Sequence, residues 1–108
     1  MADFEIKRGD TRKPLRVQLL DKDGVPVSLV GASVLFRMRG AAEGAPPKVS
    51  ATATIDDAAA GLVSYVWTAP NVDTAGQFKG EFAVTIAAKT ETVPAGGYLS
   101  ITIWENLA

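Results

Sequence analysis

The stretch VDTAGQFKGEFAV, residues 72–84, decides how the rest of the chain is interpreted. After Val72 come Asp, Thr, Ala and Gly, a composition typical of a turn, and then alternating polar and apolar side chains. A period of two indicates a strand with one face in the core and the other in water. We therefore expect a tight corner followed by a long core strand. Its inward face comprises Phe78, Gly80, Phe82, Val84 and Ile86.

Gly80 lies between two phenylalanines on that inward face. A missing side chain at such a position admits a neighbouring aromatic ring or a bulge. The polar face of the same strand carries Gln77, Lys79, Glu81 and Thr85.

The same period of two recurs along the chain in short apolar runs separated by Gly, Pro, Asn and Asp, and no segment shows a helical period. The runs predict a central strand at 31–40 (GASVLFRMRG), a single strand at 49–55 (VSATATI), a strand at 62–69 and a last strand at 98–107. About eight short strands at this spacing are typical of an antiparallel sandwich or a small barrel. We favour the sandwich because the aromatic and β-branched residues can fill two facing sheets.

The segment DKDG, residues 21–24, predicts a hairpin turn whose returning arm is VPVSL, residues 25–29. Pro26 places that arm at a sheet edge because proline has no backbone N–H to donate. Asp21 and Asp23 also resemble the start of a calcium loop, but the later ligand positions and the closing glutamate are missing. The turn is the favoured interpretation, as it is for the RGD tripeptide at residues 8–10.

Composition narrows the classes of function. The 108 residues predict a single domain spanning 1–108. Cysteine and histidine are both absent, so the commonest general base, the commonest metal ligand and every thiolate site are missing. We expect no enzyme activity, no cofactor and no metal.

Eleven basic and twelve acidic residues leave a formal net charge of −1. This charge provides no attraction to nucleic acid or to an anionic membrane. The first ten residues, MADFEIKRGD, lack the apolar run of a signal peptide or membrane anchor. We therefore expect neither nucleic acid nor membrane as a partner.

Two tryptophans are the strongest candidates for surface contact. Trp67 shares a face with Val63 and Tyr65, so we expect it in the core. Trp104 lies off the inward register of Leu99, Ile101 and Ile103. It is the candidate contact with a partner subunit, or with a glycan whose sugar ring stacks on the indole.

Five segments taken in order resemble the β-sandwich modules of tailed bacteriophages, notably the N-terminal domain of the baseplate upper protein. They are FEIKRGDT, LLDKDGVPVSLVGASVLFRMR, AAAGLVSYVWTA, DTAGQFKGEFAV and ETVPAGGYLSITIWENL. The family motifs fall on Gly9, Asp10 and Thr11; Asp23 and Gly24; Leu29, Gly31, Ala32 and Val34; Gly61, Val63, Tyr65 and Trp67; Asp73, Thr74 and Gly76; Glu81 and Phe82; and Pro94, Gly97 and Tyr98.

The resemblance covers nearly the whole chain and implies an immunoglobulin-like β-sandwich of about seven to nine strands. It also implies a virion structural protein, made in the host cytoplasm, that attaches at the tail tip, baseplate, neck or capsid surface as an adaptor or decoration module. The resemblance implies no catalytic or cofactor residues. We expect other virion proteins as partners and a homo-oligomeric or multicopy assembly. The alternative is a carbohydrate-binding module for cell-surface attachment that uses Trp104.

Overall fold

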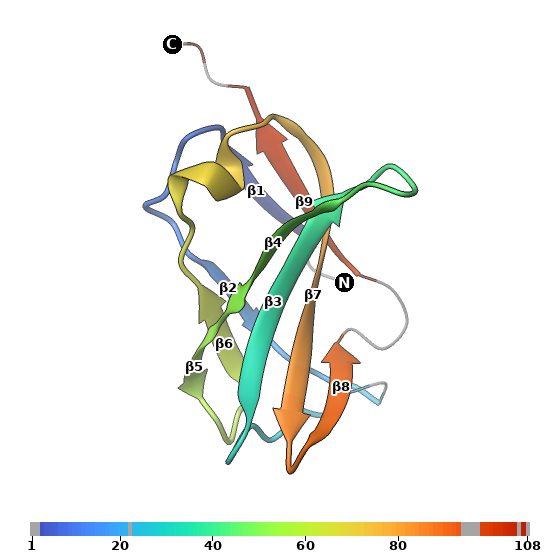
Figure 1. Cartoon of the computed structure of the whole chain (residues 1–108). Helices are drawn as coiled ribbons and strands as arrows, with labels where there is room; N and C mark the ends of the chain where they lie inside the picture. The colour runs from blue at the N-terminus through green and yellow to red at the C-terminus, as the bar shows by residue number, and fades with distance from the viewer. Residues whose placement is uncertain (1–2, 22, 94–97, 106, 108) are drawn as a thin grey trace.

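The computed structural model describes residues 3–21, 23–93, 98–105 and 107 (Figure 1). Within these residues lie nine strands and one short 3-10 helix, so the prediction of an all-β fold is confirmed. The elements are β1 (Asp3–Lys7), β2 (Leu15–Gln18), β3 (Ser33–Gly40), β4 (Pro47–Thr52), β5 (Thr54–Asp57), β6 (Leu62–Tyr65), η1 (Ala69–Val72), β7 (Gly76–Ile86), β8 (Lys89–Val93) and β9 (Leu99–Trp104).

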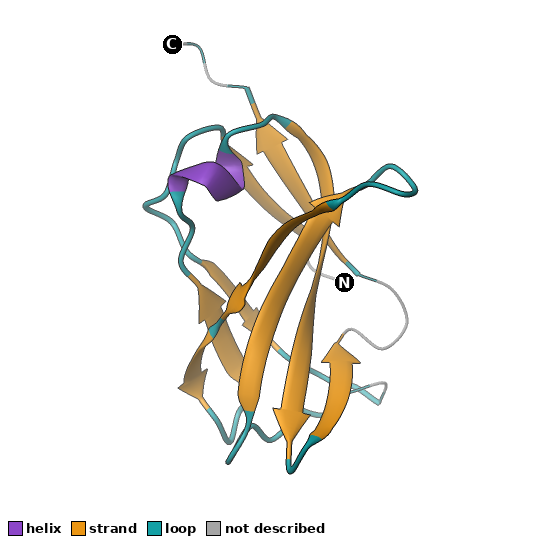
Figure 2. Ribbon diagram, in the orientation of Figure 1, coloured by secondary structure: helices purple, strands orange, loops and turns teal. Residues whose placement is uncertain are grey.

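The strands form two sheets that lie face to face, as Figure 2 shows. The larger sheet has the order β1-β9-β7-β3-β4, and β8 pairs with the part of β7 that β9 does not reach. The smaller sheet has the order β2-β6-β5. The predicted sandwich is confirmed, and β3 is a central strand as its sequence indicated.

One pairing departs from the predicted antiparallel arrangement, because β1 runs parallel to β9. A parallel pair needs a long connection between its strands. Here the first and last strands of the chain form the pair, so the rest of the sandwich supplies that connection.

The strand β7 confirms most of the pattern from which the analysis of the sequence began. Phe78, Phe82 and Val84 are buried, and all three face the smaller sheet together with Gly80. Ile86 was expected inward but is 38% exposed. It is the last residue of β7, and the tight turn at Ala87 and Ala88 lifts it beyond the sandwich interior.

The core is built on aromatic rings from both sheets. The ring of Phe36 lies 4.8 Å from that of Tyr65, 5.2 Å from Phe82 and 5.7 Å from Trp67, measured between centroids. Trp67 is buried, as predicted. Offset and edge-on ring pairs of this kind stabilise a core beyond the area that they bury. Phe36 therefore links the larger sheet to the smaller one.

Gly80 makes room for these rings. A β-carbon built on it would lie 2.8 Å from Cδ1 of Ile101 and 3.1 Å from Cε1 of Phe36. The expectation that this glycine admits a neighbouring aromatic ring is confirmed.

The single strand predicted at 49–55 is in fact two strands in different sheets. The predicted alternation of inward and outward side chains is confirmed for this segment, since Val49 and Ala53 are buried. However, β4 ends at Thr52 in the larger sheet and β5 begins at Thr54 in the smaller one. A period of two cannot reveal this crossing because the chain keeps the same face inward as it passes from one sheet to the other.

The returning arm predicted at 25–29 does not form a strand. The turn itself is present, since Oδ1 of Asp21 accepts hydrogen bonds from the backbone N–H groups of Asp23 and Val25. Beyond it, only an isolated bridge joins Leu20 to Pro26. The missing N–H of Pro26 limits the ladder that could follow.

The corner before β7 contains η1, a helical turn that the residue pattern did not predict. The hydroxyl of Tyr65 donates a hydrogen bond to Oδ1 of Asn71 at 2.7 Å, and the same oxygen accepts one from the backbone N–H of Thr68. Burial raises the pKa of Tyr65, and the bond to Asn71 partly opposes that rise. The corner is thus fixed to the core through one side-chain amide.

Two glycine substitutions should separate backbone crowding from side-chain crowding. A β-carbon at Gly61, where φ is +70°, would lie 2.8 Å from the carbonyl oxygens of Leu19 and Val27. Backbone atoms cannot move aside, so we expect Gly61→Ala to lower the free energy of unfolding by about 2–4 kcal/mol. Gly80→Ala should cost about 1–2 kcal/mol, because the flexible end of Ile101 can shift.

Chemical denaturation of the wild type and of these two variants measures both effects. Gly31→Ala is the matched control, since Gly31 also has a positive φ but no atom within 4 Å of the added carbon. It isolates the cost of the left-handed backbone, about 1 kcal/mol. An equal loss for Gly31→Ala and Gly61→Ala would contradict the crowding at Gly61.

Candidate functional site

Clusters suited to metal chemistry are missing from the part of the chain that the structure describes. It contains no group of three or more His, Cys, Asp or Glu side chains able to hold a metal ion. In the same residues, no helical segment has the length and apolar character needed to cross a membrane. The candidate site lies among the exposed side chains of the sheets.

The outer face of the larger sheet bears a groove of about 470 Å³. Side chains at alternate positions of three neighbouring strands point into it, because successive residues of a strand face opposite sides of the sheet. We call it the basic groove. Its outward-facing side chains are Arg37 and Arg39 from β3, Ser50 from β4, Lys79 and Glu81 from β7, and Tyr98 just before β9.

The register between β3 and β7 decides which charges meet in the basic groove. Arg37 lies opposite Glu81, and Nη1 of the arginine is 3.5 Å from Oε2 of the glutamate. Two residues farther along β3, Arg39 lies directly opposite Lys79. Opposite charges stabilise a cross-strand pair and like charges destabilise it. The groove therefore contains one compensated pair and one pair of cations.

Tyr98 supplies the aromatic wall of the basic groove. It is 45% exposed, and Nζ of Lys79 lies 4.6 Å from the centroid of its ring. A cation over an aromatic face is attracted by the negative charge of that face. The contact holds Lys79 within the groove beside the cationic pair.

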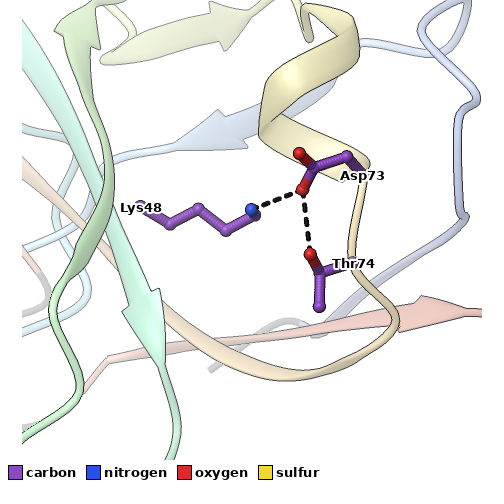
Figure 3. Close-up of polar contacts among 3 residues, drawn as sticks. All are labelled: Lys48, Asp73 and Thr74. Carbon is purple, nitrogen blue, oxygen red and sulfur yellow. Dashed lines mark hydrogen bonds and ion pairs between the residues drawn. The ribbon is translucent and has the colours of Figure 1, made fainter.

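Lys48 is turned away from the basic groove, although it lies on β4 beside it. A bulge between Met38 and Arg39 shifts the register, so that Arg39 pairs with Pro47. Nζ of Lys48 then donates to Oδ1 of Asp73 at 2.6 Å (Figure 3). The same oxygen accepts a bond from the Thr74 hydroxyl at 2.9 Å. This ion pair ties β4 to the corner before β7.

Trp104 lies on the same outer face but outside the basic groove. It is 52% exposed, so the expectation that its ring avoids the core is confirmed. Its indole N–H donates to Oε1 of Glu5 on β1 at 2.8 Å. It lies four positions along β9 from Ser100, the partner of Lys79, and four positions span about 13 Å along a strand. The pair formed by Gln77 and Thr102 lies between them.

Residue spacing predicted the exposure of Trp104 but not the basic groove. A signal was present, since Arg37 and Arg39 alternate with buried residues, as do Lys79 and Glu81. Nothing in the sequence showed that β3 lies beside β7, and therefore the two runs of charge could not be brought together.

Comparison with known proteins identifies the fold. No family model matches the chain, and no curated protein matches it in sequence. The N-terminal domain of phage TP901-1 ORF48 matches it in structure. The TM-score is 0.69 at 13% sequence identity, and the match covers 95% of this chain and 85% of that domain.

The structural match confirms, at the level of the fold, the resemblance to phage β-sandwich modules that the motifs indicated. An identity of 13% shows the shared fold alone. The coverage shows that both sheets take part in the likeness.

The ion pair between Lys48 and Asp73 should make stability depend on acidity. The hydrogen bond from Lys48, followed by that from Thr74, lowers the pKa of Asp73. A carboxylate with a lowered pKa stabilises the fold above its ordinary pKa and loses that contribution as the pH falls through the lowered value. We expect Asp73→Asn to lower the Tm at neutral pH, by less and less as the pH drops below about 4.

Thermal unfolding followed over a pH series measures this difference. Asp23→Asn is the control, since Asp23 is an exposed turn residue whose backbone N–H, and not its carboxylate, makes the hydrogen bond to Asp21. It should leave the Tm close to that of the wild type at every pH. A deficit of Asp73→Asn that stays constant into the acid range would show that the ion pair does not cause it.

Proposed function

We propose that this protein is a structural component of a phage particle that acts through contacts with other virion proteins. The observation that carries the proposal is the fold, shared over 95% of the chain with a domain of a phage protein. The candidate locations remain those of an adaptor or decoration module in the tail or baseplate, at the neck, or on the capsid surface. A role in binding, without catalysis, agrees with the composition, which lacks histidine and cysteine.

The outer face of the larger sheet supports a role in protein contact. It presents a groove with an exposed aromatic side chain and three basic ones, and farther along it the half-exposed ring of Trp104. Aromatic residues and arginine are enriched at protein interfaces, where they supply much of the binding energy. Many copies in one particle would multiply the strength of modest contacts.

Mass spectrometry of purified particles tests the proposal. Particles of the phage that encodes this chain should contain it at a fixed stoichiometry through successive density gradients. A virus carrying a deletion of the gene should assemble incomplete particles, and a plasmid copy should restore them. Particles that lack the chain after purification and are complete without it would exclude a structural role.

A carbohydrate-binding role is the second candidate, and the exposed ring of Trp104 favours it. A flat indole face can stack on a sugar ring. This candidate predicts binding on a glycan array that falls at least tenfold in Trp104→Ala. Trp67→Phe is unsuitable as a control because that ring is in the core, so Tyr98→Ala serves as the surface control. Binding that both variants retain would exclude stacking on Trp104.

A further inference from the structure

The basic groove contains an electrostatic mismatch. Arg39 and Lys79 lie directly opposite each other on an exposed sheet face, where like charges repel. Among the residues that the structure describes, the three ion pairs leave both of these side chains without a carboxylate partner. A carboxylate from another molecule would compensate the pair through charge-assisted hydrogen bonds.

A segment with the complementary charge lies at the other end of the molecule. Asp56 and Asp57 are adjacent and exposed at the end of β5. Figure 1 shows β5 ending at the opposite end of the sandwich from the arrowhead of β3, where Arg39 is the second-last residue. Leu62, the cross-strand partner of Asp57, is 38% exposed. We call these three residues the acidic end.

The acidic end is complementary to the basic groove in two respects. Its two carboxylates match the cationic pair, and its exposed leucine matches the aromatic wall formed by Tyr98. A volume of about 470 Å³ is enough for several side chains. Both surfaces belong to one chain and lie at opposite ends, so one copy cannot bring them together.

We infer that copies of this protein associate head to tail, with the acidic end of one copy docked in the basic groove of the next. Such a contact leaves one free surface at each end of a pair, so it continues into a ring or a filament. The inference rests on the proposed function, which places many copies in one particle, and it names a second copy as the occupant of the groove. Exposed ion pairs are weak and screened by salt, so the free protein should associate only when concentrated.

Sedimentation velocity of the purified full chain tests the inference. The weight-average sedimentation coefficient should rise through a concentration series that extends into the millimolar range at low salt, and high salt should abolish the rise. The groove variant Arg39→Glu/Lys79→Glu and the end variant Asp56→Lys/Asp57→Lys should each stay monomeric. An equimolar mixture of the two should associate, because each then supplies the partner surface that the other lacks.

Matched variants separate docking from net charge and from folding. Arg12→Glu/Lys89→Glu changes the charge by the same amount at exposed positions outside the basic groove and should associate like the wild type. The milder variants Arg39→Gln/Lys79→Gln and Asp56→Asn/Asp57→Asn should weaken association at least fivefold. The asparagines keep a side-chain oxygen for Ser64 and for the backbone N–H of Ala60, which the aspartates bind now.

Two results would overturn the inference. One is a wild-type protein that stays monomeric at low salt over the whole series, which would leave the groove to another acidic partner. The other is association that survives both charge reversals when all variants have the thermal midpoint of the wild type. Either result could occur in a chain that mass spectrometry finds in particles, so this failure is distinct from failure of the proposed function.

Discussion

Eight residues of β3 pair with eight of β7 in one antiparallel register, from Ser33 opposite Thr85 to Gly40 opposite Phe78. This pairing fixes both faces of the larger sheet at once. On the inner face it sets Phe36 beside Phe82 and leaves Gly80 where two side chains need space. On the outer face it sets Arg37 against Glu81 and Arg39 against Lys79. A slip of one residue would exchange the two faces, so the core and the basic groove depend on the same register.

Contacts between aromatic rings in the core stabilise that register. Phe36 contacts the ring of Tyr65 on the smaller sheet and that of Trp67 just beyond β6, and each contact fits only one position of β3. The interior is close-packed, so a shifted phenylalanine would meet backbone or leave a cavity. The exposed charges on the outer face are therefore held by packing on the inner one, and the like-charge pair persists because the buried contacts outweigh its repulsion.

The two ends of the sandwich differ in chemistry. At one end, the bulge in β4 turns Lys48 toward Asp73 and keeps it out of the groove, leaving Arg39 and Lys79 as neighbours. At the other, β5 ends in two aspartates. Two cations that have no ion-pair partner among the described residues on one surface, and two exposed carboxylates on another, are the arrangement that a head-to-tail contact requires.

The sequence by itself determined the class of fold and the composition of the core. Alternation is a local property, and therefore the buried faces of β7, β6 and β9 and the exposed ring of Trp104 could be predicted from residue spacing alone. The ends of strands were less certain, and Ile86 was placed wrongly because the end of the sheet, and not the pattern, decides where burial stops.

Tertiary structure decided which strands are neighbours. It decided the crossing at Ala53, the parallel pairing of β1 with β9 and the pairing of Arg39 with Lys79. The sequences of these segments contain no signal that shows which strands pair. The physical reason is that strand pairing is specified by the packing of whole faces, which sums contacts from distant parts of the chain. The alternation of side chains determines which face of a strand is buried, but only the assembled sandwich determines which strand lies beside it.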